Sequence, residues 1–436
     1  MWANETIFYQ IYPLGFCGAP FENDGVLAHR LPKIKEWIPH MKKLGIGGIY
    51  LSPVFESDTH GYNTRDYKKV DCRLGDNEDL KELVHTLHEN GIRVLLDGVF
   101  NHVGRGFFAF QDVLRNREKS PYLSWFHIAL DGNSCYNDGL WYEGWEGNYD
   151  LVKLNLHNPA VVEHLLECVK YWIDEFDIDG LRLDVAYCLT DEFVYRLRSA
   201  CDSYKQEFFL VGEMLHGDYN QKMRDGMLHS VTNYECYKGL YSSFNSMNLF
   251  EINHSLLRQF GPENWTLYRG KHLWNFVDNH DVTRIASILN NPRHLPLVYG
   301  ILFGMPGICC IYYGSEWGTQ AKKEQGDPAL RVSFEKPEWT ALTDTIAKLC
   351  EIKSSHPALN HGGFRSVLLT NRQCIFERKT EGERILVAVN ADETDYMAHF
   401  DAGCATAREL LTGATQEFAG GSLLRAYSMQ YWLMEN

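Results

Sequence analysis

Short apolar runs alternate with longer amphipathic stretches along the first three quarters of the chain. The apolar runs have the length of β-strands, and eight of them occur, at 7–14, 47–54, 92–100, 180–185, 208–214, 230–235, 273–281 and 307–316. Apolar residues recur at helical spacing in the segments 77–90, 159–176 and 339–353. Eight strands that alternate with helices predict the fold class α/β and, within it, a closed (β/α)8 TIM barrel.

Two segments depart from this alternation. Between Asn101 and about Leu156 no helical period is visible, and aromatic residues are dense. A loop of that length in a compact domain is usually functional, so 102–156 is predicted to be a small inserted domain after strand 3 of a barrel built from 1–101 and 157–359. From 360 to 436, short alternating strands and turn signals predict a C-terminal antiparallel β domain, a β-sandwich.

The amino-acid composition excludes several kinds of binding partner and indicates the compartment of the protein. The 436 residues carry 42 Lys and Arg against 57 Asp and Glu, a net charge of −15, which excludes nucleic acid and anionic membrane surfaces as favoured partners. No apolar stretch approaches the ~18 residues that span a bilayer, and the N-terminus lacks the marks of a signal peptide. Twelve cysteines occur without a CxxC pair, which favours buried free thiols in a cytoplasmic protein over a disulfide framework or a zinc site. The oligomeric state stays open.

Charged residues gather at the ends of the predicted strands. Asp97 ends strand 3, Arg182 and Asp184 lie two apart on one face of strand 4, Glu213 ends strand 5, and the run 278–281 (Asp-Asn-His-Asp) ends strand 7. Strand ends of a barrel converge at its mouth. Taken singly, each residue could have a purely structural role. Asp278 and Asn279 fit a helix cap or turn, and Arg182 fits a structural partner of Asp97. Taken together, like charges in one cleft indicate a functional site.

Cleavage of a glycosidic bond needs two close carboxylates, one to attack or stabilise the anomeric carbon and one to donate a proton to the leaving oxygen. Asp184 fits the first role because Arg182 on the same face is expected to lower its pKa. Glu213, in the apolar context VGEM, fits the second role. The chain has no GxSxG, P-loop or GxGxxG motif, so acyl transfer, phosphoryl transfer and dinucleotide binding lack their usual signals.

Six segments together resemble the signatures of the α-amylase superfamily of glycoside hydrolases. They are HGYNTRDY (60–67), DGVFNH (97–102), LVKLN (151–155), GLRLDVA (180–186), VGEM (211–214) and FVDNHD (276–281). The resemblance covers the barrel, the long third loop and the C-terminal β domain. LVKLN, with Lys153, is closest to the neopullulanase and cyclomaltodextrinase branch, whereas FVDNHD is the more general amylase form.

The resemblance implies a role for each matching position. It makes Asp184 the nucleophile, Glu213 the acid/base and Asp281 the third carboxylate. It implies substrate contacts at Tyr62, which would stack beneath the reacting ring, at His102 and His280, which would donate to its hydroxyls, and at Arg182, the partner of the nucleophile; Asp97 is implied to be structural.

Other positions depart from the superfamily or leave alternatives open. Tyr187 and Cys188 replace the Lys-His of many starch-digesting members, which argues against an ordinary endo-amylase and leaves the leaving-group side of the cleft unassigned. Tyr187 is expected to contact substrate. The aromatic cluster at 136–149 fits a sugar-stacking wall and a small core equally, with Trp141 and Trp145 the favoured ligand contacts. Many members of the superfamily hold calcium near the position of Asn101, but the other oxygen ligands of such a site are not identifiable in the sequence. A structural, hydrogen-bonding role for Asn101 is therefore favoured over a calcium ligand.

We therefore expect a retaining glycoside hydrolase that cleaves α-glycosidic bonds in malto-oligosaccharides, cyclodextrins and pullulan through a covalent glycosyl-enzyme. No metal or cofactor is expected in the chemistry. A 4-α-glucanotransferase acting on the same α-glucan oligosaccharides is the alternative, and a non-catalytic glucan-binding homologue is the alternative from another class. All three carboxylates are present in the sequence, which disfavours the non-catalytic homologue.

Overall fold

A computed structural model describes residues 1–435, and its centre is an eight-stranded parallel sheet that closes on itself. The strand order is β13-β12-β11-β5-β2-β1-β15-β14, and a parallel bridge between Thr232 and Trp274 joins the two outer strands. The strands are β1 (Ile7–Ile11), β2 (Gly48–Leu51), β5 (Arg93–Gly98), β11 (Gly180–Leu183), β12 (Phe209–Gly212), β13 (Ser230–Val231), β14 (Trp274–Asn275) and β15 (Ile308–Tyr312). The predicted (β/α)8 barrel is confirmed.

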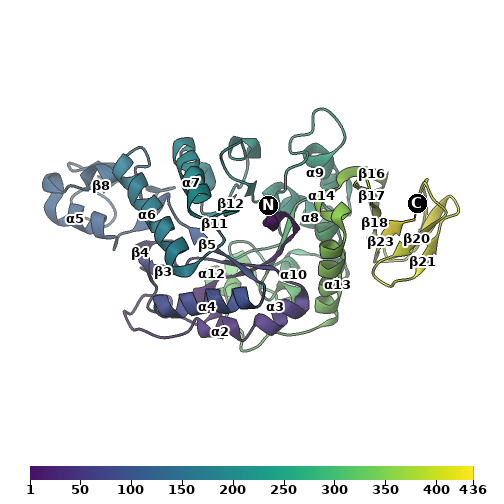
Figure 1. The fold of residues 1–436 in the computed structure, drawn as a ribbon, viewed down its shortest axis with the longest axis horizontal. Helices are drawn as coiled ribbons and strands as arrows, with labels where there is room; N and C mark the ends of the chain where they lie inside the picture. The colour runs from purple at the N-terminus through teal and green to yellow at the C-terminus, as the bar shows by residue number, and fades with distance from the viewer. Residues whose placement is uncertain (436) are drawn as a thin grey trace.

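Helices surround this sheet because each carries one apolar face (Figure 1). In α4 the buried residues Leu80, Leu83, Val84 and Leu87 repeat at helical spacing. The longer helices are α3 (Ile38–Leu44), α4 (Asn77–Glu89), α6 (Pro159–Phe176), α7 (Asp191–Tyr204), α8 (Tyr234–Asn245), α9 (Phe250–Phe260), α11 (Leu295–Gly304) and α13 (Ala341–Ser355). Short helices are α1 (Pro13–Phe16), α2 (Pro32–Lys35), α10 (Ile285–Ile288), α12 (Asp327–Leu330) and α14 (Pro357–His361). Within residues 1–435, none of the helices combines the length and apolarity needed to cross a membrane.

Two predicted strands are much shorter in the structure. The run 230–235 forms a strand only at Ser230–Val231 before α8 begins, and the run 273–281 forms one only at Trp274–Asn275. Apolar content does not distinguish a strand from the irregular segment that follows it in a barrel mouth. The consequence is that the polar run 278–281 lies beyond its strand, in the irregular segment that follows β14.

The segment after β5 projects from one end of the molecule (Figure 1). It contains β6 (His102–Gly104), β7 (Ile128–Ala129), β8 (Trp141–Tyr142), β9 (Gly144–Trp145) and β10 (Asn148–Lys153). It also contains α5 (Phe108–Asn116), so the expectation of no helix between Asn101 and Leu156 is wrong. Only three residues of α5 are buried, and a nine-residue helix held by one small contact face leaves a weak periodic signal.

The C-terminal strands form a separate antiparallel layer at the other end of the molecule (Figure 1). A six-stranded sheet has the order β16-β17-β18-β23-β20-β21, and β19 and β22 form a second, two-stranded sheet. The strands are β16 (Gly363–Leu369), β17 (Gln373–Lys379), β18 (Arg384–Asn390), β19 (Tyr396–His399), β20 (Thr406–Glu409), β21 (Thr415–Glu417), β22 (Gly421–Leu424) and β23 (Ser428–Met434). The predicted C-terminal antiparallel β domain is confirmed, with more strands than the alternating pattern revealed.

Candidate active site

The carboxyl ends of three neighbouring strands bring four charged residues together. Strands β5, β11 and β12 are adjacent, and Arg182 on β11 pairs in register with Asp97 on β5 and with Val211 on β12. Asp184 and Glu213 follow directly after β11 and β12. Residues one or two past the ends of parallel neighbours face the same opening, so the convergence predicted from strand ends is found.

Arg182 links these acids through one guanidinium group. Its Nη1 lies 3.0 Å from Asp97 Oδ1 and 2.8 Å from Asp184 Oδ1, and its Nη2 lies 2.9 Å from Glu213 Oε1. All four side chains are buried. The sequence left two roles open for Arg182, as a structural partner of Asp97 or as the partner of the predicted nucleophile. The geometry fits both roles, because Arg182 contacts Asp97 and Asp184 at the same time.

Burial raises the pKa of Asp184 well above its ordinary value, while the Arg182 charge opposes that rise and the neighbouring charges of Glu213 and Asp97 add to it. Arg182 lowers the pKa of Asp184 as expected, but burial and the two neighbouring acids outweigh it, so the net shift is upward. The physical reason is that one cation shared among three buried acids does not offset the loss of water.

A strained turn connects Asp184 to Glu213. The backbone of Val185 has φ 39° and ψ 48°, in the left-handed region, and Val185 is the single β-branched residue with positive φ among the described residues. Its N–H donates to Glu213 Oε2 at 3.0 Å. A left-handed conformation costs a β-branched residue of order 1–3 kcal/mol, which persists only where surrounding contacts enforce it.

Asp281 sits across the mouth, and two basic side chains hold it. Oδ1 lies 2.7 Å from Arg331 Nη2 and Oδ2 lies 3.0 Å from His280 Nε2. Burial alone would raise the pKa of Asp281, but His280 and Arg331 hold it well below its ordinary value, so this carboxyl is ionised. Arg331 follows the short helix α12 and also pairs with Asp327 at 3.1 Å. Sequence reasoning missed Arg331 because it lies in an irregular segment after the last strand, outside every signature.

His280 and Tyr62 form a stacked pair against this carboxylate. Their rings are 5.7 Å apart and nearly parallel, and the Tyr62 hydroxyl contacts both His280 Nε2 and Asp97 Oδ2, the latter at 3.1 Å. The Gln10 amide donates to His280 Nδ1 at 2.7 Å. The other ring nitrogen of His280, Nε2, therefore faces Asp281 and Tyr62, and His280 orients these two residues from beneath the mouth.

His102 lies on the other side of Asp184. Its Nε2 is 3.8 Å from Asp184 Oδ2 and has no hydrogen-bond partner among residues 1–435. Burial lowers the pKa of His102 to about 3, so the ring is neutral at physiological pH. A neutral, unpartnered imidazole nitrogen beside the nucleophile candidate is available to a ligand hydroxyl.

These side chains open into one cavity of about 520 Å³, within the range of pockets that hold small ligands. Of the nine predicted site residues, six line it directly: Tyr62, His102, Asp184, Tyr187, Glu213 and Asp281. Arg182 and His280 lie beneath it and contact lining residues. Trp141 is not among the lining residues, whereas Trp145 is. Trp141 lies half-exposed on β8 and donates to the Tyr149 hydroxyl at 3.2 Å.

Asp278 and Asn279 have the structural role that a helix cap or turn would give them. Asp278 is buried, accepts from the N–H of Ile285 at 2.8 Å and from the Ser315 hydroxyl at 2.8 Å, and does not line the cavity. The Asn279 side chain accepts from the N–H of Asp281 at 2.8 Å and donates to the Tyr234 hydroxyl at 3.0 Å. Both residues shape the turn that presents Asp281.

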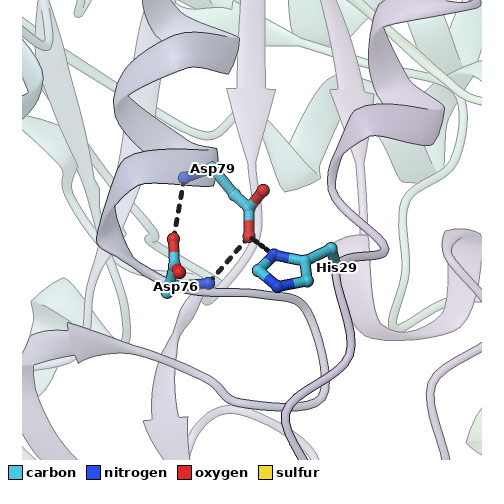
Figure 2. Close-up of side chains that lie close together, drawn as sticks. All are labelled: His29, Asp76 and Asp79. Atoms are coloured by element: carbon cyan, nitrogen blue, oxygen red, sulfur yellow. Dashed lines mark hydrogen bonds and ion pairs between the residues drawn. The ribbon is translucent and has the colours of Figure 1, made fainter.

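Two clusters among residues 1–435 bring His, Cys, Asp or Glu side chains close enough together to hold a metal ion. In the cluster shown in Figure 2, Asp76 caps α4 by accepting from the N–H of Asp79, and Asp79 in turn accepts from Asp76 N and from His29. This is a capping box with a histidine attached. The second cluster is Glu56, Asp71 and Cys72, in which Arg73 binds Asp71 at 2.7 Å.

The Asn101 side chain contacts His102 Nδ1 at 3.1 Å, and it is buried. That contact gives Asn101 a hydrogen-bonding role in orienting the His102 ring.

An eight-stranded parallel barrel with three carboxylates at its mouth defines a glycoside hydrolase by fold and site. Residues 10–354 match the family described as "Alpha amylase, catalytic domain", and the chain belongs to this family.

Relatives with known names resemble the chain over most of its length. A cyclomaltodextrinase of Thermoanaerobacter pseudethanolicus is 31% identical over 89% of this chain and 70% of its own. A maltogenic alpha-amylase of Bacillus acidopullulyticus is 32% identical over 100% of this chain and 78% of its own. A solved structure named cyclomaltodextrinase superposes with a TM-score of 0.88 at 29% identity, over 99% of this chain and 78% of that one.

Proposed function

We propose that the protein is a retaining hydrolase of α-glucan oligosaccharides that works through a covalent glycosyl-enzyme. The observation that carries the proposal is the shared guanidinium of Arg182, which contacts Asp184 at 2.8 Å and Glu213 at 2.9 Å. Retaining glycosidases need their two carboxyl groups close together, about 5–5.5 Å apart, so that one attacks while the other donates a proton. Two acids bound to one guanidinium support that spacing.

In the first step the Asp184 carboxylate attacks the anomeric carbon while Glu213 transfers its proton to the glycosidic oxygen. The bond from carbon to that oxygen breaks, the shortened glucan leaves as an alcohol, and a glycosyl ester on Asp184 remains. In the second step Glu213 takes a proton from water, whose oxygen attacks the same carbon and releases Asp184. The reactive state proposed has one proton on the pair, carried by Glu213, so that Asp184 can attack while Glu213 donates.

The remaining side chains hold the sugar. Asp281, kept ionised by His280 and Arg331, is proposed to bind hydroxyls of the distorted ring more tightly in the transition state than in the ground state. Tyr62 is proposed to lie beneath the ring, and His102 to donate to a hydroxyl through its unpartnered Nε2. Because Trp145 lines the cavity and Trp141 does not, we propose Trp145 as the stacking contact from the inserted segment.

We propose short malto-oligosaccharides as substrates, with cyclodextrins and pullulan in addition. The names of the relatives, a cyclomaltodextrinase and a maltogenic alpha-amylase, support this substrate class. The chemistry proposed needs no metal or cofactor, because Asp184 and Glu213 supply the nucleophile and the proton. An intracellular location is proposed as well, since all twelve cysteines are free in the structure and nine are buried.

Transfer to a second sugar is the alternative outcome of the same intermediate. Tyr187 and Leu215 line the cavity beside Glu213, and both offer apolar surface to an incoming sugar acceptor in place of water. Incubation with maltotriose at high concentration separates the outcomes, because longer oligosaccharides indicate transfer, whereas glucose and maltose alone indicate hydrolysis.

The proposal is tested by incubating the protein with starch, pullulan, β-cyclodextrin and maltotriose and separating the products by chromatography. Cleavage of maltotriose and β-cyclodextrin is expected, with the newly formed end in the α-configuration by NMR at early times. A β-configured product would contradict retention. No cleavage of any of the four glucans would contradict the substrate class and favour a non-catalytic glucan-binding role.

A further inference from the structure

A second cavity lies at the opposite end of the barrel from the carboxylates. It has a volume of about 190 Å³. His272 and Gly307 line it just before β14 and β15 begin, whereas Asp281 follows the end of β14. The end of α14 and the start of β16 complete the wall with Asn360 and Gly363. The cavity therefore lies between the base of the barrel and the C-terminal strands and is separate from the proposed active site.

Every ionisable side chain that lines this cavity is basic. The five are Arg269, Lys271, His272, His361 and Arg378, and no Asp or Glu of residues 1–435 is among the lining residues. The chain as a whole has the opposite bias, with a net charge of −15. Among residues 1–435, the one acid in hydrogen-bond contact with the set is the exposed Glu5, which binds His361 at 2.7 Å from outside the lining. A local excess of positive charge in an acidic protein attracts anions.

The deepest member of the set is Arg378, which is fully buried. Its guanidinium donates to the carbonyl oxygens of Gly304, Leu359 and Gly362 at 2.8–2.9 Å, and its Nε has no partner among the described residues. Burial lowers the pKa of Arg378 to about 9. The carbonyls of Gly304 and Leu359 belong to the last turns of α11 and α14, so helix dipoles offset part of the charge.

A second buried cation lies beside Arg378. Lys353 is 2% exposed and donates to the Leu359 carbonyl at 3.2 Å, the same oxygen that Arg378 uses. Burial lowers the pKa of Lys353 to about 8, and the Arg378 charge contributes to that lowering. Within residues 1–435 both cations bind main-chain carbonyl oxygens, and no carboxylate pairs with either of them. Two neighbouring buried cations without an acid are costly, and a bound anion nearby would reduce that cost.

We propose that this basic cavity binds a phosphate-type oxyanion, either free orthophosphate or the phosphate group of a hexose phosphate. Arg and Lys side chains are the usual protein partners of phosphate oxygens. Gly307, Gly362 and Gly363 leave the backbone uncovered along one wall, and Phe260 and Phe364 supply apolar surface for the carbon skeleton of a sugar. The ligand would join the base of the barrel to the C-terminal strands, so binding stabilises the folded chain by mass action.

Gly363 offers a variant that fills the site without disturbing the fold. Gly363 is exposed, its φ lies outside the left-handed region, and a Cβ there would meet only the Lys379 carbonyl oxygen, at 3.9 Å. Gly363→Glu places a carboxylate at the cavity mouth, and Gly363→Gln is the matched neutral control. Arg269→Gln removes one exposed charge of the lining, and Arg196→Gln removes an exposed charge elsewhere.

The test measures the melting temperature and calorimetric binding of the full chain with sodium phosphate, glucose 1-phosphate, glucose and sodium chloride at equal ionic strength. A saturable rise in melting temperature with phosphate or glucose 1-phosphate, and not with glucose or chloride, is expected. Equal affinity for the two ligands identifies the oxyanion itself, and tighter binding of glucose 1-phosphate identifies a hexose phosphate. The affinity is expected to fall about three- to tenfold in Arg269→Gln and to be unchanged in Arg196→Gln.

In Gly363→Glu the ligand-dependent rise should vanish while the ligand-free melting temperature increases, and Gly363→Gln should retain ligand binding. Cleavage of maltotriose should be unchanged in both Gly363 variants, because the cavity is remote from Asp184. The absence of saturable phosphate binding by the unmodified protein would overturn the proposal. Undiminished binding in Gly363→Glu would also overturn it, because the anion would then bind elsewhere.

Discussion

The main-chain N–H of Val185 donates a hydrogen bond to Oε2 of Glu213 at 3.0 Å, from a backbone held in the left-handed region. This contact connects the residue after the proposed nucleophile to the proposed acid/base. It fixes the position of one carboxylate oxygen relative to the Asp184 backbone. Strain of this kind at a functional site indicates that geometry is maintained at the expense of stability.

Val185→Gly is expected to relax this turn and to release Glu213 from its fixed position. Hydrolysis of maltotriose should fall about tenfold or more in kcat, while hydrolysis of an α-glucosyl fluoride, whose leaving group needs little protonation, should fall much less. Steady-state kinetics on both substrates measures the difference. Val185→Ala keeps a Cβ and serves as the control, and equal losses on the two substrates would contradict a role in positioning Glu213.

Glu213→Gln is expected to remove the proton donor. Turnover of natural glucans should drop by about 10²–10⁴-fold, the usual contribution of general acid catalysis, whereas aryl α-glucosides with good leaving groups should retain far more of their first-step rate. The measurement is a comparison of the two substrate types in the variant and the unmodified protein. If both types lost activity in the same proportion, proton donation by Glu213 would be excluded.

Asp184 and Asp281 are expected to affect stability in opposite directions at pH 7. Burial raises the pKa of Asp184, so the folded chain binds the carboxyl proton of Asp184 more tightly than the unfolded chain does. The protonated group therefore stabilises the folded chain at low pH, and this stabilisation is lost as pH rises through the pKa of the folded state. Asp184→Asn removes a buried charge and should raise the melting temperature at pH 7, since each pKa unit corresponds to about 1.4 kcal/mol.

For Asp281 the pH dependence of the stability contribution has the opposite sign. His280 and Arg331 hold its pKa well below the ordinary value, so its contribution to stability is present above the unfolded pKa and is lost as pH falls through the folded one. Asp281→Asn should therefore lower the melting temperature at pH 7, and both variants should be inactive. Thermal unfolding followed from pH 4 to pH 8 checks the two signs, and equal shifts for the two variants would contradict the assigned electrostatics.

The rate profile should reflect the raised pKa of Asp184. As pH falls through that value the nucleophile becomes protonated, so kcat/KM is expected to decline on the acid side at a pH above the ordinary Asp value of about 3.9. The profile is measured with maltotriose between pH 3.5 and pH 9, with stability checked at each pH. An acid limb at or below pH 3.9 would show that Asp184 is ionised more easily than its burial implies.

The barrel could be predicted from sequence because its strands are continuous apolar runs and its helices carry clear apolar faces. Strand β11 and helix α6 agree closely with the segments 180–185 and 159–176. The helix α5 was missed because its nine residues bury only three side chains. The ends of β13 and β14 were placed too far along the chain, since apolar residues continue into the mouth of the barrel.

The site could be predicted where a residue lies in or next to a strand. Asp184, Glu213 and Asp281 line one cavity because each directly follows a strand or the turn after it. Arg331 could not be found, because its contact with Asp281 depends on how the loop after β15 folds back over the mouth. Trp141 and Trp145 are separated by only four residues, and the backbone between β8 and β9 decides which of them reaches the cavity.

The central claim is that Asp184 becomes covalently bound to the sugar during each turnover. The most direct measurement is to incubate the protein with 5-fluoro-α-glucosyl fluoride, whose ester intermediate breaks down slowly, and to locate the added mass by peptide mass spectrometry. The account predicts one fluoroglucosyl group per chain, attached to the peptide that contains Asp184, and none in Asp184→Asn. Attachment to any other residue, or turnover of the reagent without a trapped intermediate, would contradict it.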